Sequence, residues 1–167
     1  MALTDYFLKI EGIEGDSNDP QYPNWIQIDS FNWGATSNPG PSPGGQSPDA
    51  GKANVQDLNI TTHVNKATPS IGQYCLNSKK IAKVELALRI SGDKPQEYMR
   101  FTLTDVYCTS HQIGGTGGSG GGSDTTKPTE SDSFSFGKID VAYGSQDAKG
   151  VVASLDKKMS YDLKKGK

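Results

Sequence analysis

The sequence predicts a mainly β protein, a compact β-barrel or two-sheet sandwich of antiparallel strands with one short α-helix packed on it. Three observations support this class. Several segments alternate apolar and polar residues with a period of two, as half-buried strands do. One segment carries helical spacing, and two long stretches rich in proline or glycine separate the strands. A chain of 167 residues is most simply a single domain, residues 1–167.

The segment WIQIDSFNW carries apolar bulk on both faces. Ile26 and Ile28 share one parity, and Trp25, Phe31 and Trp33 share the other. A strand that is apolar on both sides is expected to be buried on both sides. Two interpretations stay open: a central strand of the core, or a strand whose aromatic residues meet a neighbouring subunit.

Two long stretches lack periodicity and are predicted to be loops. Residues 35–53 contain four prolines, which oppose a helix or a central strand. Residues 112–130 contain glycines in the order G-x-G-x-x-G, which a dinucleotide-binding turn also uses. That turn needs a helix directly after it, and Pro128 among Ser, Thr and Asp opposes one. The glycine run is therefore interpreted as a flexible connector between strands.

The middle of the chain alternates on either side of the predicted helix. DLNITTHV is expected to be a strand, and ATPSIGQYCLNSKK is expected to be the helix, with Thr68 as its N-cap and Pro69 in its first position. The helix would pack through Ile71, Tyr74 and Cys75. The strand after it would bury Ala82, Val84, Leu86, Leu88 and Ile90.

Two later strands change the phase of their alternation. The apolar residues switch parity between Leu103 and Val106, and again between Phe136 and Ile139. A β-bulge would flip the faces in this way, and Gly137 suits such a position. Because bulges bend strands, these two positions are predicted to help close a barrel. A last strand alternates from Leu155 to Leu163.

The charge balance and hydropathy argue against two classes of partner. With 17 basic and 19 acidic side chains, the chain lacks the basic excess of a nucleic-acid binder. No apolar run approaches the length of a membrane-spanning helix, so no membrane insertion is expected. The first residues, MALTDYFLKIEG, do not resemble a signal peptide.

No catalytic, metal or cofactor site is predicted. Cys75 and Cys108 are too few for a disulfide framework and are interpreted as buried free thiols. Cys108 and His111 could supply two zinc ligands, but no second pair has the required spacing. There is no G-x-S-x-G nucleophile motif, and the carboxylates are dispersed. The protein is therefore not expected to be an enzyme.

Four segments in this order resemble one family. They are YFLKIEGIEGDS, IQIDSFNWGA, GKANVQDLNITTHVNKATPSI and EYMRFTLTDVYCTSHQIGGTGGSG, the last followed by a Phe-x-Phe strand. Together they resemble Hcp, the haemolysin-coregulated tube protein of the bacterial type VI secretion system. NVQDL followed by the TPSI helix start is the most specific element, and the resemblance covers nearly the whole chain.

The resemblance implies a homohexameric ring and stacking of rings into a hollow tube inside a contractile sheath. It also implies a VgrG spike protein at the tip, and small secreted effectors carried and stabilised in the lumen. Such a protein would be cytoplasmic when assembled and then secreted through the type VI machine without a signal peptide. The alternative is a monomeric ligand- or carbohydrate-binding β-sandwich.

The resemblance also implies roles for particular residues. Asn32, in the sequence FNWG, is a candidate contact to effectors in the lumen, since an amide can both donate and accept hydrogen bonds. The proline-rich loop would reach a neighbouring ring, and the candidate ring-stacking residues in it are Pro41, Gly45, Gln46 and Asp49.

Overall fold

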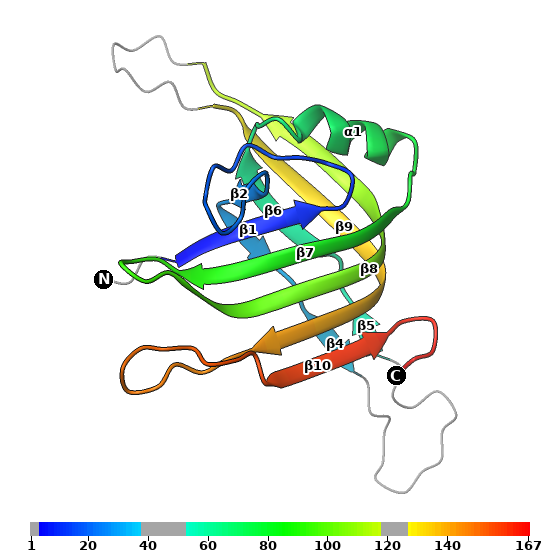
Figure 1. The fold of residues 1–167 in the computed structure, drawn as a ribbon. Coiled ribbons are helices and arrows are strands. Elements are labelled where there is room, and N and C mark those ends of the chain that lie inside the picture. The colour runs from blue at the N-terminus through cyan, green and yellow to red at the C-terminus, as the bar shows by residue number, and fades with distance from the viewer. Residues whose placement is uncertain (1–3, 38–52, 118–126) are drawn as a thin grey trace, which may run out of the picture.

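The computed structural model describes residues 4–37, 53–117 and 127–167 of the chain (Figure 1). Strands dominate this part, and one short helix accompanies them. The elements are β1 (Thr4–Ile10), β2 (Ile26–Ile28), β3 (Ser30–Asn32), β4 (Ala35–Ser37), β5 (Ala53–Val55), β6 (Leu58–His63), α1 (Thr68–Leu76), β7 (Ile81–Ile90), β8 (Gln96–Gly114), β9 (Thr129–Tyr143) and β10 (Lys157–Asp162).

The main sheet is antiparallel and nearly closes on itself. Its strands follow the order β2-β1-β7-β8-β9-β6-β3, with β10 added beside β9, while β4 and β5 form a separate ribbon. Since β2 and β3 are consecutive in the chain but lie at opposite ends of this order, the sheet must be rolled up. The Thr62 hydroxyl donates to the carbonyl of Gln27 at 2.8 Å across the seam. The predicted mainly β, barrel-like class is confirmed.

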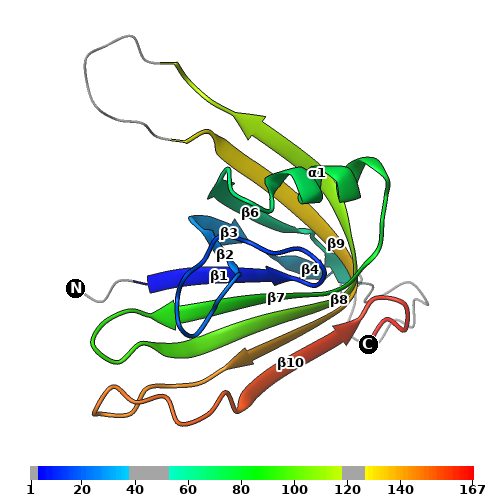
Figure 2. The ribbon, with the colours of Figure 1, turned by 45° about the horizontal axis from the view of Figure 1, so that its top comes forward.

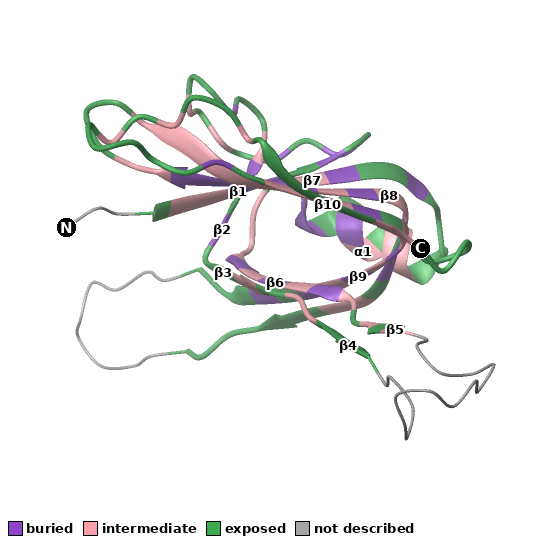
Figure 3. Ribbon diagram, turned by 90° about the horizontal axis from the view of Figure 1, so that it is seen from below, coloured by how far each residue is buried: buried purple, intermediate pink, exposed green. Residues whose placement is uncertain are grey.

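The core fills the space between the two walls of the rolled sheet (Figure 3). Its residues occupy the inward positions of each alternating strand, and each apolar side chain removed from water contributes roughly 1.5–3 kcal/mol. The largest fully buried apolar side chains are Leu8, Ile10, Ile26, Leu58, Ile60, Ile71, Ile81, Leu86, Leu103, Phe134 and Ile139.

The long strands β8 and β9 bend and belong to both walls (Figures 2 and 3). The predicted changes of phase occur, but their interpretation as β-bulges is wrong. Thr104 pairs with Lys138 and Val106 with Phe136 in one unbroken register, so no residue is inserted in either strand. Both strands instead change phase together at Asp105, whose φ is 56°, and Gly137. We call this position the kink.

The kink coincides with a change of partner for β9. Before it, β9 pairs with β6 as far as Phe134; beyond it, β9 pairs with β10 from Lys138 onward. Strand β7 changes phase at the same level, because Ile81 is buried and Ala82 is exposed, contrary to the expected burial of Ala82. Register shifts do occur elsewhere, at Leu88/Arg89 in β7 and at Cys108/Ser110 in β8.

Helix α1 lies against β8 at one end of the barrel (Figure 2). Pro69 is in its first turn, as expected, but the N-cap residue is Ala67 and not Thr68. Instead, the Asn65 side chain accepts a hydrogen bond from the Ala67 amide, and the Thr68 hydroxyl accepts one from the Asn65 amide. Ile71 is the buried anchor of the helix.

In the described part of the chain, no helix has the length and apolar character needed to cross a membrane.

Candidate functional site

One wall of the barrel presents uncharged polar side chains on its outside. On β3, β6 and the first half of β9, the positions between the core residues point outward because strand side chains alternate. The register places Asn32, Asn59 and Ser133 in one cross-strand row, and Ser30, Thr61 and Ser131 in the next. We call these six residues the amide–hydroxyl face: Ser30, Asn32, Asn59, Thr61, Ser131 and Ser133.

Hydrogen bonds connect the first row of this face. The Asn59 amide donates to the Asn32 side-chain oxygen at 2.9 Å, and the Asn59 side-chain oxygen accepts from the Ser133 hydroxyl. Thr109 extends the network by donating to Asp57 at 2.8 Å. Asn32 itself is exposed, so the structure places this predicted contact residue on the surface.

The amide–hydroxyl face suits contact with many different polypeptides. Amides and hydroxyls both donate and accept hydrogen bonds, and they carry no charge that would reject acidic or basic sequences. Such contacts are individually modest, about 0.5–1.5 kcal/mol each. A surface of this kind therefore holds a passenger without selecting it strongly.

The other wall presents ionised side chains on its outside. We call Lys9, Lys83, Glu85, Glu97 and Arg100, from β1, β7 and β8, the charged face. Arg100 contacts Glu97 at 2.5 Å and Glu85 at 3.6 Å, and Lys83 also lies 3.6 Å from Glu85. The Arg100–Glu85 pair joins β8 to β7, and cross-strand pairs of opposite charge support a sheet. The other two pairs lie within one strand, and all three give the surface a defined charge pattern.

An aromatic cluster covered by the loop after β1 adjoins the charged face. Phe7 stacks on Tyr22 with ring centroids 4.6 Å apart, and Tyr22 meets Trp25 edge to face at 4.9 Å. The Arg89 guanidinium lies 4.8 Å from the centre of the Phe7 ring. Burial, and then the nearby Glu97 carboxylate, raise the pKa of Tyr22 to about 12.

The three candidate interface aromatics do not share one face, so the single alternation expected for their segment is wrong. Trp25 belongs to the outer aromatic cluster, whereas Phe31 and Trp33 pack against the inner core beside Phe101. The physical reason is that the chain leaves β2 and enters β3 at Asp29, which shifts the parity. All three are partly buried, and their role at a subunit interface stays a prediction.

The predicted loops are shorter than expected where the structure describes them. Residues 35–37 and 53–55 pair as the β4–β5 ribbon, and β8 runs on to Gly114 while β9 begins at Thr129. The candidate ring-stacking residues lie outside the described residues; they are Pro41, Gly45, Gln46 and Asp49. The centre of the glycine run also lies outside them.

Both cysteines are free, in α1 and in β8 as the sequence indicated. Cys108 is buried, and Cys75 is only partly so. Burial, and then the neighbouring Cys75, raise the pKa of the Cys108 thiol to about 12. A thiol held in this protonated form is a poor nucleophile.

Sequence reasoning missed Asn59 and the serines of β9. A signal for the serines was present, because Ser131, Ser133 and Ser135 alternate with inward residues in the segment ESDSFSF. Asn59 has no such signal, since only the pairing of β6 with β3 brings it beside Asn32.

Comparison with known proteins assigns this barrel to a family. The family model described as "Type VI secretion system effector, Hcp" matches residues 7–143. The curated protein hcp1 of Pseudomonas aeruginosa is 30% identical over 148 residues, which cover 87% of this chain and 86% of that protein. The chain belongs to the Hcp family. It is therefore a type VI secretion tube protein, as the resemblance of its four segments implied.

Solved Hcp structures share the fold. Hcp1 from Salmonella typhimurium is 27% identical with a TM-score of 0.72, covering 100% of this chain and 99% of its own. A type VI secretion system effector from Yersinia pestis is 32% identical with a TM-score of 0.71, covering 95% and 99%. A structure described as a type six secretion system protein has the higher TM-score of 0.85 at 24% identity, covering 99% of both chains.

Proposed function

We propose that this Hcp protein forms homohexameric rings that stack into a hollow conduit and carry small secreted effectors through it. The observation that carries the proposal is the contrast between the two walls of one barrel. A ring built from such subunits can turn the amide–hydroxyl face toward the lumen and leave the charged face for protein partners outside.

The lumen assignment follows from what a passenger requires. Effectors differ in sequence and charge, so a surface that binds and releases all of them must avoid fixed charges. Asn32, Asn59 and Ser133 meet that requirement with a hydrogen-bonded row across three strands. Passengers held in this way would be protected during export, which is the carrier and chaperone role.

The other partners belong to the same proposal. The VgrG spike would cap the tube, and the contractile sheath would surround it, so that the protein is cytoplasmic while assembled and extracellular after firing. The Pro-rich loop with Pro41, Gly45, Gln46 and Asp49 would join successive rings, and Trp25, Phe31 and Trp33 would support contacts between subunits.

The particle size of the purified protein tests the ring. Gel filtration with light scattering gives the mass, and negative-stain images of the same fraction show whether the particles have an open centre. Rings of six support the proposal. A strict monomer at high concentration would overturn intrinsic ring assembly and favour a ligand- or carbohydrate-binding β-sandwich.

A further inference from the structure

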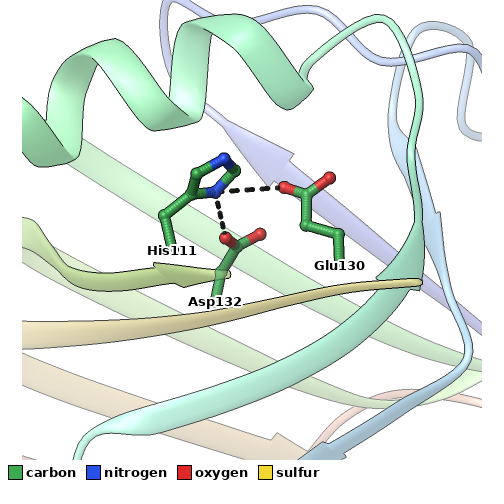
Figure 4. Close-up of side chains that lie close together, drawn as sticks. All are labelled: His111, Glu130 and Asp132. Carbon is green, nitrogen blue, oxygen red and sulfur yellow. Dashed lines mark hydrogen bonds and ion pairs between the residues drawn. The ribbon is translucent and has the colours of Figure 1, made fainter. Parts of the chain in front are cut away.

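Three ionisable side chains converge beneath helix α1: His111, Glu130 and Asp132 (Figure 4). His111 comes from β8, and the two acids come from β9. Asp132 is the register partner of His111, and Glu130 points to the same side of the sheet because it lies two residues earlier. One nitrogen or oxygen from each of the three lies within 4.8 Å of the others.

The two carboxylates are sealed from water. Glu130 is 0% exposed and Asp132 is 1% exposed. The His111 Nδ1 atom lies 2.6 Å from an Asp132 oxygen and 3.5 Å from a Glu130 oxygen, so a single imidazole serves both acids. Buried carboxylates are costly unless a counter-charge and hydrogen bonds compensate them.

One oxygen of each acid makes a hydrogen bond and the other does not. Glu130 Oε2 accepts a hydrogen bond from the Thr68 hydroxyl, and Asp132 Oδ1 contacts His111. Within the described residues, Asp132 Oδ2 and Glu130 Oε1 are buried without a hydrogen bond, and Glu130 Oε1 has only the 3.5 Å contact with His111 Nδ1. Buried polar atoms are normally satisfied, so an oxygen without a hydrogen bond on each of two adjacent acids calls for an occupant.

We propose that His111, Glu130 and Asp132 bind a divalent transition-metal cation between β8 and β9 beneath α1. An imidazole nitrogen and carboxylate oxygens bind zinc at about 2.0–2.2 Å in tetrahedral geometry, so any two ligand atoms stand about 3.5 Å apart. The three side chains need only a small adjustment to reach that spacing. A doubly charged cation would balance both carboxylates, which one imidazole cannot do.

This site differs from the Cys108–His111 pair, which could supply two zinc ligands but has no second pair with the required spacing in the sequence. The ligands that join His111 come from the opposite strand of an antiparallel pair, so no short sequence spacing announces them. Gly72 of α1 leaves room for the ring, since a Cβ there would lie 3.1 Å from His111 Nε2.

Occupancy would connect three parts of the fold. Glu130 is already hydrogen-bonded to Thr68 at the start of α1, while His111 and Asp132 belong to the β8–β9 pair that leads into the glycine-rich loop. A cation bound to the folded chain alone stabilises it by mass action. The bound metal would therefore raise the melting temperature, whether the protein is a ring or a monomer.

The full chain, stripped of metal with a chelator, tests the proposal by titration calorimetry and thermal melting with Zn²⁺ and, separately, Mn²⁺. We expect one saturable site per chain and a metal-dependent rise in Tm. Glu130→Gln and Asp132→Asn keep the side-chain shapes and should reduce affinity at least tenfold. His111→Gln supplies a third variant should either of the others fail to fold.

The matched control is His63→Ala. His63 also lies beside a carboxylate, 2.7 Å from Asp29, but their side chains are 43% and 50% exposed. This variant should keep the calorimetric site and the rise in Tm. The proposal is overturned if neither ion binds the wild-type chain, or if binding survives unchanged in the folded Asp132→Asn and His111→Gln variants.

Discussion

The amide–hydroxyl face and the charged face are built on the same sheet with the same alternation, yet they carry opposite chemistries. The change can be followed along β9, which presents Ser131 and Ser133 outward before the kink and, on the wall of the charged face, Lys138 and Asp140 after it. One continuous strand pair can therefore serve two surfaces when it bends between them. The bend separates a face of adaptable hydrogen bonds from a face with a fixed charge pattern.

The two faces should also differ in how much stability they contribute. Near the charged face, Arg89 has a side chain that is only 7% exposed and contacts Asp5 at 3.0 Å and Asp19 at 2.7 Å. None of the six residues of the amide–hydroxyl face is buried, since three are exposed and three are half-buried. Burial therefore decides which substitutions are costly.

The largest effect is expected from Arg89→Ala. This change would leave two carboxylates without their shared partner and remove the cation above Phe7, so the free energy of unfolding should fall by about 3–5 kcal/mol. Urea denaturation measures it. The control is Lys83→Ala, whose side chain is 48% exposed and whose ion pair is worth about 0–1 kcal/mol. Equal losses in the two variants would contradict the role of burial.

Acidification should weaken the contact between Arg89 and Asp19. The hydrogen bond from Arg89 is the main cause that lowers the pKa of Asp19 below its ordinary 3.8. A lowered folded-state pKa gives stability that is present above the unfolded value and is lost as the pH falls through the folded value. We expect the unfolding free energy to decline below about pH 4, and less steeply in Asp19→Asn. Parallel pH profiles for the two proteins would contradict this assignment.

A smaller effect is expected at the kink that separates the faces. In Gly137→Ala the new Cβ would lie 3.3 Å from the Asp105 Cβ, so the two strands must move apart slightly, at a cost of about 1 kcal/mol. Gly114→Ala is the control, because its Cβ would meet no atom within 4 Å. Thermal melts compare the two variants, and a Gly137→Ala protein as stable as the control would show that the kink is not tightly packed.

The smallest effect on stability is expected from Asn32→Ala, within about 0.5 kcal/mol, because the side chain is exposed. If the face lines the lumen, effector affinity should drop about fivefold for one lost hydrogen bond of about 1 kcal/mol. Quantitative co-purification with small effectors measures the drop. Thr36→Ala, an exposed hydroxyl on the β4–β5 ribbon, should bind normally, and indistinguishable binding by both variants would contradict the lumen assignment.

Much of the fold was accessible from the sequence because alternation reports burial directly. The strands around Ile60 and Leu86 and the helix around Ile71 were all placed correctly. The cause of the kink could not be predicted from the sequence. The apolar pattern of one strand changes phase in the same way whether a β-bulge shifts its register with the partner or both strands bend together. Only the register between Thr104 and Lys138 distinguishes the two.

The candidate functional site could be predicted only in part from the sequence. Asn32 followed from a family resemblance, but its neighbours Asn59 and Ser133 depend on long-range pairing. The buried acids carried a signal that was overlooked: Glu130 and Asp132 share the parity of Phe134 and Phe136, which predicts that they face the core. A carboxylate in phase with phenylalanines therefore indicates a buried polar site.

The position of β9 has a consequence for how the chain folds. Among the described strands it alone pairs with three others, β6, β8 and β10, and it pairs with β6 across more than 60 residues of chain. Until β9 has been synthesised, β6 and β8 each present an unpaired edge that can bind other chains. The rate at which β9 docks therefore sets how long newly made subunits are exposed to aggregation before they are ready to assemble.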